Sequence, residues 1–502
     1  MISLSKKLPI FYSALLLTGV NLLLRLVGTS FQVYLSGRIG AAGIGLLQLT
    51  MSVGSLAMIA GIAGVRTATM YLTAEELGRK QKGTVSWVLS GCFLYSILCS
   101  GAVALALYRF APQIAGQWIG DKRTVEALRL LAAFLPVSCL CSVMTGYFTA
   151  ANRIGTLAAV EVAEQLCSML LTMTALQLWA GSDPSRACLC VVLGSGLGSI
   201  LTLLCLVVLR LLQKEAAGPR IPVARRLYQA AVPLALADIL KSGISTTENL
   251  MVPKRLALCA AISDPLASFG MISGMVFPVL MFPACILFGL AELLIPELAR
   301  CAAAGSKGRI DYLVRKSLRL AMLYGFFFSG AMVLAAVPLC QRLYGSGEAG
   351  QALKGYALLI PMLYCDAITD AMTKGLGQQK ICVRYNILTN GLDVVFLYLL
   401  LPKYGMTGYY ISFFATHLLN FILSLGRLLK ITGQSVPFYV PALTCGATLA
   451  AVWVTSPAPS PLSRCLCFAA IWGSLLYLLK IVKREDLLWL RGLLRGKMAA
   501  KK

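Results

Sequence analysis

The sequence predicts an all-α, multi-pass membrane protein, and three of its properties lead to this prediction. Of the 502 residues, 58% are hydrophobic and only 13% are charged, whereas soluble globular domains contain about a quarter charged residues. The mean hydropathy is +0.79. Apolar stretches recur along the chain, and each provides the roughly 20 residues that a helix needs to cross a hydrocarbon core. A soluble enzyme is therefore excluded.

Fourteen apolar stretches are long enough to span a membrane. They lie at 9–35, 43–70, 84–108, 125–150, 156–180, 187–212, 227–250, 266–296, 313–341, 349–373, 381–402, 405–429, 435–456 and 463–482. We expect each to form a transmembrane helix, because a helix satisfies its own backbone hydrogen bonds in lipid. The first stretch is too long for a signal sequence and lacks a small-residue cleavage site, so we assign it as a helix.

The positive charges predict the orientation of the chain. If the N-terminus is cytoplasmic, most of the 45 Lys and Arg residues fall in cytoplasmic loops, as the positive-inside rule requires. Both termini are then in the cytoplasm and the protein is in the cell membrane. We interpret the net charge of +25 as topology signals near anionic membrane lipids, concentrated at 220–226, 300–319 and 480–502, and we expect no nucleic-acid partner.

Cofactor-dependent or catalytic chemistry is not expected from this sequence. Most of the seventeen cysteines lie in apolar stretches, where a thiol behaves as a small hydrophobe. With one histidine, His417, a zinc site is improbable. No loop is long enough for a catalytic or nucleotide-binding domain, and the phosphate-loop pattern GxxxxGK[ST] is absent. We expect a protein that is not an enzyme and that has no cofactor other than a coupling ion.

An internal repeat predicts two lobes of six helices around a central cavity. Gly146–Asn152 and Gly375–Gln379 lie between corresponding pairs of apolar stretches. At nearly the same offset, Asn21–Arg25 corresponds to Asn249–Arg255. Six stretches precede each equivalent point, so the two copies keep one orientation, as parallel repeats do. We therefore predict an N-lobe at 1–215, a C-lobe at 216–432, and two further helices with a basic tail at 433–502.

Four segments resemble the multidrug/oligosaccharidyl-lipid/polysaccharide exporter superfamily, and within it the stage V sporulation protein B and polysaccharide flippase group. They are Gly64–Glu75 (GVRTATMYLTAE), Gly146–Ala150 (GYFTA) with Glu164-Gln165 downstream, Ser245–Leu256 (STTENLMVPKRL), and Phe269–Pro278 (FGMISGMVFP) continuing to Leu294–Glu297 (LIPE). The sequence departs from the group at Arg66, where proline is usual, and at Ser168, where a basic residue is usual. Lipid II flippases also carry an arginine in the eighth helix, whereas nothing basic occurs here between Asp264 and Arg300.

This resemblance implies a flippase rather than an enzyme. The implied substrate is an undecaprenyl-pyrophosphate-linked saccharide for the cell wall, its peptidoglycan, the spore cortex made in sporulation, or an exopolysaccharide. The two lobes are expected to move it across the cytoplasmic membrane by alternating access. Cell-wall synthesis proteins are possible partners.

Ionisable and amide side chains within the apolar stretches are the candidate substrate-binding residues. Each charge costs about 2.5–3.5 kcal/mol at a helix centre, so those retained usually face a cavity or a partner. A guanidinium can grip a pyrophosphate bidentately, and Arg25 lies one turn after Asn21. The candidates are Asn21, Arg25, Arg66, Lys241, Glu248 and Asn249. The alternative is that the arginines pair with Glu161, Glu164 or Glu248 and only fix helix packing.

A second set of side chains is the candidate site for a coupling ion. Asn386, Asn390 and Asp393 follow the i, i+4, i+7 spacing of one helix face. Oxygen ligands suit sodium, and a carboxylate can instead carry a proton. The resemblance to lipid II flippases implies a sodium site that joins the seventh, eleventh and twelfth helices. It makes Asp238, Asn390 and Asp393 the candidates for sodium or a proton.

Other polar residues in the apolar stretches have simpler explanations. Asp366 and Asp370 share a helix face, but without an external domain we do not expect catalysis. We expect salt bridges to Lys241 and Lys374 for the remaining acids. His417, one turn before Asn420, is more often a hydrogen-bonded core histidine than a proton shuttle.

Three alternative functions stay open at this point. A drug exporter of the same fold would need an acidic, aromatic cavity, so the charge of the cavity lining discriminates. A membrane-embedded glycosyltransferase would need a long outer loop with paired carboxylates, and the loop after 9–35 has only a few residues. The third alternative is a scaffold of wall synthesis that transports nothing.

Overall fold

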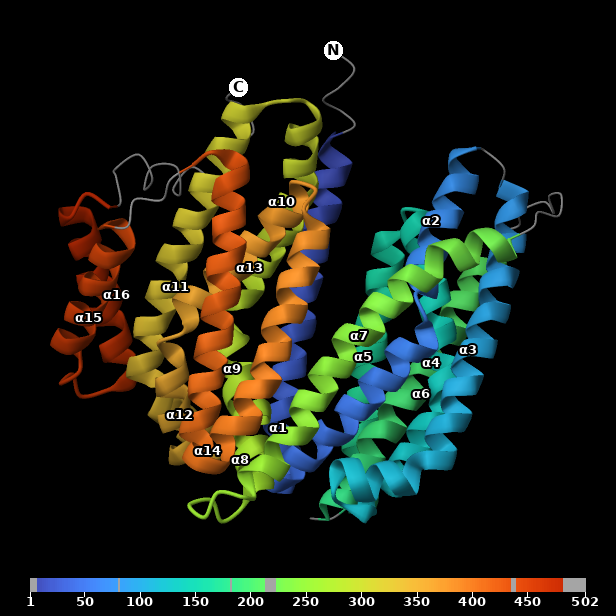
Figure 1. Ribbon diagram of the computed structural model, residues 1–502, viewed down its shortest axis with the longest axis horizontal. Coiled ribbons are helices and arrows are strands. Elements are labelled where there is room, and N and C mark those ends of the chain that lie inside the picture. Colours follow the sequence, from blue (N-terminus) through green and yellow to red (C-terminus); the bar gives the residue numbers. More distant parts are fainter. Residues whose placement is uncertain (1–6, 80–81, 181–182, 213–222, 435–438, 482–502) are drawn as a thin grey trace. The chain divides into compact units, whose positions relative to one another are not determined.

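The computed structural model describes residues 7–79, 82–180, 183–212, 223–434 and 439–481, with side chains from Leu22 onward near the N-terminus. Within these residues every regular element is a helix and there is no strand (Figure 1). The all-α, multi-pass class is confirmed. The predicted basic tail after Ile481 and most of the basic loop before Val223 lie outside the described residues. The chain divides into two compact units, each described by itself below.

The N-terminal unit contains the residues up to Pro278 together with Asn390–Ser412. Its helices are α1 (Lys7–Ile62), α2 (Val65–Gly78), α3 (Val85–Gln113), α4 (Val125–Ala150), α5 (Ile154–Ala175), α6 (Pro184–Leu211), α7 (Ala224–Leu256) and α8 (Pro265–Met271), with the middle part of α14 (Gln379–Thr432). The π-helical segments η2 (Ile114–Ile119) and η5 (Ile272–Val276) continue α3 and α8.

Glycines break the two longest helices where the sequence predicts loops. In α1 the backbone leaves helical geometry at Gly40, with φ 68°, and in α14 at Gly405, with φ 55°. Only glycine adopts such angles without strain. These breaks separate the predicted pairs 9–35 and 43–70, and 381–402 and 405–429. A third break, at Gly64, ends α1 before α2.

The exact number of transmembrane helices stays a prediction. Among the described residues, eight helices are long and apolar enough to span a membrane, and nine if the bent pair Pro265–Met281 and Ala284–Ala303 forms one span. The predicted fourteen differ partly because Leu22–Gly78 and Gln379–Thr432, each of more than 50 residues, are taken as one span each in spite of their glycine breaks. The predicted stretch 349–373 is divided between two shorter helices, α12 (Gly347–Ala357) and α13 (Ile360–Gly375).

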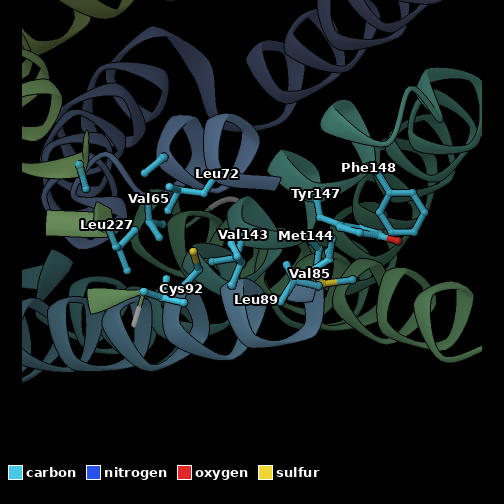
Figure 2. Packing of buried hydrophobic residues seen from close by; sticks show 14 of the residues in the cluster. Val65, Leu72, Val85, Leu89, Cys92, Val143, Met144, Tyr147, Phe148 and Leu227 are labelled. Atoms are coloured by element: carbon cyan, nitrogen blue, oxygen red, sulfur yellow. The ribbon is translucent and has the colours of Figure 1, made fainter. Parts of the chain in front are cut away.

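An apolar cluster joins the six helices from α2 to α7 of the N-terminal unit (Figure 2). Its labelled members come from α2 (Val65, Leu72), α3 (Val85, Leu89, Cys92), α4 (Val143, Met144, Tyr147, Phe148) and α7 (Leu227). Lipid tails are as apolar as these side chains, so the cluster stabilises the unit mainly through close packing. It fixes α7 against the N-terminal helices.

An ion-pair network reinforces this attachment of α7. Arg226 donates to Glu75 at 2.7 Å and to Glu76 at 2.9 Å, and Thr84 also donates to Glu76 at 2.9 Å. The Glu76 side chain is only 1% exposed, and a buried carboxylate is tolerated only when it is paired and hydrogen-bonded. Two acidic residues of the motif-bearing helix α2 are therefore bonded to the first turn of α7.

The C-terminal unit contains Val279–Thr389 and the residues from Phe413 onward. Its complete helices are α10 (Ala284–Ala303), α11 (Lys307–Tyr344), α12, α13, α15 (Tyr439–Thr455) and α16 (Pro461–Leu478), and α9 (Phe277–Met281) crosses the boundary. The chain bends by 64° between α9 and α10, at Pro283, which has no backbone N–H group for a helical hydrogen bond. Tyr364 donates to the Leu280 carbonyl and Tyr324 to the Pro283 carbonyl, at 2.9 and 2.7 Å, so both carbonyl groups at the bend keep a partner.

The predicted lobes and these compact units are different divisions of the chain. The lobes rest on an internal repeat in the sequence, with boundaries at 215 and 432. The units rest on which helices pack together, and they place α7 and α8 with the N-terminal helices. The lobe boundaries therefore stay a prediction.

Small residues allow α1 and α8 to approach closely within the N-terminal unit. A Cβ atom added to Gly270 would lie 2.0 Å from the Ala41 carbonyl oxygen, and one added to Gly45 would lie 2.4 Å from the Leu266 carbonyl oxygen. Such backbone-to-backbone contact is typical of glycine-mediated packing in membranes.

We predict that Gly270→Ala destabilises the protein by about 1–3 kcal/mol, because the methyl group has no free volume and backbone must move. Gly243→Ala in α7 is the matched control: nothing lies within 4 Å of the added methyl group, and alanine favours the helix. Thermal unfolding of the purified protein in detergent measures both. Equal melting temperatures for the two variants would contradict the described contact.

Candidate functional site

Two carboxyl groups meet inside the N-terminal unit. Glu248 on α7 lies within hydrogen-bonding reach of Asp393 on α14. Asp393 is only 5% exposed, and Ser412, which is fully buried, donates to its Oδ1 at 2.6 Å. Two neighbouring carboxylates repel strongly in a low-dielectric interior, so the pair needs a proton or a cation between its members.

Hydrogen bonds hold this part of α7 against α1. Asn249 donates from Nδ2 to Ser52 Oγ at 3.0 Å, and Thr246 donates to the Ser52 carbonyl at 3.2 Å. Glu248 lies between these two residues in sequence. Its position is therefore fixed by the neighbours on both sides, which is the precision that an ion site needs.

The structure regroups the residues predicted for coupling. It brings Asp393 together with Glu248, which the sequence had suggested for substrate binding. Asp238 is ten residues before Glu248 on the same helix, about 15 Å away along the axis, and its side chain is exposed. Asn390 is half-buried on α14, one turn before Asp393.

The predicted cationic residues lie on three different helices of the N-terminal unit. The Arg25 side chain is exposed on α1, Arg66 is exposed in the first turn of α2, and Lys241 is exposed on α7. Arg66 is close enough to Glu161 for their charges to attract, which is the alternative of helix packing considered above. The side chain of Asn21 lies outside the described residues.

A cavity of about 640 Å³ lies within the N-terminal unit, between α1, α4, α5 and α6. Its acidic wall is on α5 and consists of Glu161 and Glu164, and Gln165 also lines it. Ser199 donates to Glu164 at 3.5 Å and Ser138 to Ser199 at 3.2 Å. The apolar wall includes Leu24, Phe31, Met51, Met58, Phe134 and Met169. Among the described residues, no lysine or arginine lines this cavity.

Sequence reasoning had treated the two glutamates only as partners for arginines. The missed signal was their i, i+3 spacing in an otherwise apolar stretch, followed by Gln165, Ser168 and Thr172. Such spacing keeps polar groups near one helix face. That face lines the cavity. Carboxylates beside aromatic and thioether groups suit a cation with an apolar body.

A second polar cluster lies in the C-terminal unit. Asn420 on α14 donates to Asp366 on α13 at 3.0 Å, and Lys374 forms a salt bridge with Asp370 at 2.5 Å. The predicted Lys374 salt bridge is therefore present. His417 stacks on Phe413, with ring centroids 3.9 Å apart, and its Nδ1 is 2.9 Å from the Phe413 carbonyl oxygen. This is the hydrogen-bonded core histidine that the sequence favoured.

The seventeen cysteines are all free thiols. Ten are buried, and only Cys205 and Cys467 are exposed. Cys92 lies in the apolar cluster of Figure 2. These positions agree with a packing role for most of the thiols.

These features define a class of protein: a polytopic, all-helical membrane protein with paired ionisable side chains in its helices. Comparisons with known proteins agree with that class. The family described as MatE matches residues 18–174. Stage V sporulation protein B of Bacillus subtilis (strain 168) is 22% identical over 94% of this chain and 96% of that protein. Sporulation protein YkvU of the same strain is 21% identical over 66% of this chain and 82% of that protein.

Solved structures share the fold. The lipid II flippase MurJ, in an inward closed conformation, aligns with a TM-score of 0.70 at 13% identity, over 94% of this chain and all of that chain. An inward-facing multidrug resistance MATE family transporter aligns with a TM-score of 0.66 at 14% identity, over 84% of this chain and all of that chain. The chain is thus similar to members of the multidrug/oligosaccharidyl-lipid/polysaccharide exporter superfamily, the group that its motifs resemble.

Proposed function

We propose that the protein is a flippase for an undecaprenyl-pyrophosphate-linked saccharide. The observation that carries this proposal is the alignment with the lipid II flippase over nearly the whole chain. The similarity to stage V sporulation protein B, also over nearly the whole chain, supports a role in wall or spore-cortex synthesis. The superfamily and its structural neighbours are transporters, so no catalytic step is needed.

The cationic side chains are the proposed contacts of the pyrophosphate. Arg25 carries the main contact because a guanidinium offers two parallel donors to phosphate oxygens. Arg66 and Lys241 add positive charge, and Asn21 and Asn249 add amide donors. We propose that both termini are cytoplasmic, as the excess of Lys and Arg in the corresponding loops indicates. The substrate then enters from the cytoplasmic leaflet, where such lipids are assembled.

We further propose that Glu248 and Asp393 form the coupling site. A sodium ion or a proton between the two carboxyl groups removes their repulsion, and the empty pair is therefore high in free energy. Binding of the ion favours the conformation in which the two groups are close, and its release favours a conformation in which they separate. The ion gradient can in this way drive the alternation of the transporter.

We predict that Arg25→Ala prevents growth of a flippase-deficient strain that depends on this protein. Loss of a charged phosphate contact costs about 2 kcal/mol or more, which is roughly a 30-fold weaker interaction. Mass spectrometry of lipids should show accumulation of the lipid-linked precursor, and immunoblotting should show unchanged membrane insertion. Arg129→Ala, which removes a guanidinium that stacks on Tyr108 at 5.3 Å, is the matched control. Normal growth of Arg25→Ala, or of a strain that lacks the protein, would contradict the proposal.

For the coupling site we predict that Asp393→Asn and Glu248→Gln each lower ion-dependent transport about tenfold or more, because one charge of the site is lost. Asp238→Asn should retain transport, since Asp238 is about 15 Å along α7 from the pair. Transport into vesicles with and without a sodium gradient, and with and without a pH gradient, identifies the ion. If Asp238→Asn fails and Asp393→Asn does not, the coupling site lies elsewhere on α7.

A second candidate function is favoured by the acidic cavity. A cation-coupled multidrug exporter needs an acidic, aromatic binding site, and the cavity between α1, α4, α5 and α6 has two glutamates, two phenylalanines and three methionines. The fold of a multidrug resistance MATE transporter is shared. The substrate of this function would be a lipophilic cation.

The double variant Glu161→Gln/Glu164→Gln separates the two functions. For an exporter we predict that the wild-type protein raises resistance to lipophilic cations and that the double variant loses this gain, because the attraction of two carboxylates is removed. For a flippase the wild-type protein should leave resistance unchanged. Minimum inhibitory concentrations measure the first outcome, and precursor accumulation measures the second. A protein that affects neither would be a scaffold.

A further inference from the structure

A second, smaller hollow lies in the N-terminal unit, away from the acidic cavity. This groove has a volume of about 360 Å³ and is formed by α1, α3 and η2. Val53 and Ala57 of α1 form one wall, and Ala106 and Phe110 of α3 form the other. No charged side chain of the described residues lines it. The groove therefore suits a hydrocarbon chain and not a polar solute.

One end of the groove is polar and aromatic. Gln117 and Trp118 of the π-helical segment η2 close this end. Trp118 is 47% exposed and Phe110 49% exposed. Tryptophan is enriched at the depth at which membrane proteins meet lipid headgroups, because its ring is apolar and its N–H group is polar. The groove thus runs from headgroup level toward the apolar middle of the unit.

A lysine stands at this polar end. The ammonium group of Lys254, in the last turn of α7, donates to the backbone carbonyl of Gln117. An ammonium group has three donors, and Lys254 forms no salt bridge with any carboxylate of the described residues. Its neighbour Arg255 is occupied differently, because its guanidinium lies 3.2 Å from the centroid of the Tyr398 ring. Lys254 is therefore the cation that faces an incoming headgroup.

We propose that this groove is a binding site for an anionic membrane phospholipid. One acyl chain lies between α1 and α3, and the headgroup phosphate is bound by Lys254 at the end of η2. The apolar groove and the lysine at its polar end together indicate the ligand. They match a lipid that has an acyl chain and a net negative headgroup. A zwitterionic lipid would bring its own cation toward Lys254 and bind less well.

The bound lipid has a structural consequence for α7. Lys254 belongs to the helix that carries Glu248 and that Arg226 attaches to α2. A phosphate at Lys254 would tie the other end of α7 to α1 and α3. Anionic lipid is thus expected to stabilise the N-terminal unit, whatever substrate the protein carries, so this inference does not depend on the proposed function.

The test is native mass spectrometry of the delipidated, full-length protein with phosphatidylglycerol or phosphatidylcholine. We expect phosphatidylglycerol to bind at least about tenfold more tightly, and Lys254→Ala to remove most of this difference, equivalent to about 1.4 kcal/mol. Ala106→Trp should block the groove and abolish the tight site. Lys403→Ala, which removes an exposed lysine of the same unit on α14, should change nothing.

Each other outcome overturns the proposal. Equal binding of the two lipids, or phosphatidylglycerol binding that Lys254→Ala leaves unchanged, would show that the groove does not select an anionic phospholipid. Displacement of phosphatidylglycerol by an equimolar polyprenyl phosphate would show that the groove belongs to the transported lipid. Melting curves of the lipid-free variants check folding, and Lys254→Ala keeps the test valid if Ala106→Trp does not fold, because Lys254 is a surface residue.

Discussion

The hydrocarbon interior of a membrane offers no hydrogen-bond partner to the backbone, and most of this architecture follows from that constraint. The described part of the chain forms helices, which satisfy their own backbone hydrogen bonds. The places where the helices break follow the same constraint. Gly40 and Gly405 allow sharp turns without a side-chain clash. At the bend near Pro283, two tyrosine hydroxyls donate to the backbone carbonyls of Leu280 and Pro283. At these three breaks, the backbone either carries no side chain or receives a hydrogen-bond donor.

The hydrocarbon interior also disfavours charged side chains that have no partner. The way in which each charge is paired therefore separates structural charged residues from functional ones. Glu76 forms a salt bridge with Arg226, and Asp370 forms one with Lys374. In each pair the two charges have opposite sign and balance each other. Glu248 and Asp393 are two acidic groups that lie close together. Two carboxyl groups held close together in a low-dielectric interior cost stability, which is a reason to look for function at that point. The acidic wall of Glu161 and Glu164 is a milder case, because it faces a cavity that water or a ligand can enter.

The helices could be predicted from the sequence because hydropathy and length act locally. The loop positions at Gly40 and Gly405 followed from the same signal. The pairing of Glu248 with Asp393 could not be predicted, since they are far apart in sequence and only the folding of the N-terminal unit brings them together. For Asp238 the resemblance to a family pointed to the right helix, but the structure brings a different carboxylate of that helix to Asp393. The spacing of Glu161 and Glu164 was visible in the sequence, but we interpreted these residues as salt-bridge partners. The sequence does not show that α1, α4 and α6 form a cavity with α5.

The burial of the thiols has a practical consequence for experiments on this protein. Thiolates form and react only where water and base can reach them, and just two of the seventeen cysteines, Cys205 and Cys467, have exposed side chains. Replacing these two would leave a background that modifies slowly with water-soluble maleimides. A single new cysteine at a cavity position such as Ser195 would then report, through its labelling rate, when that side of the molecule opens to the aqueous phase.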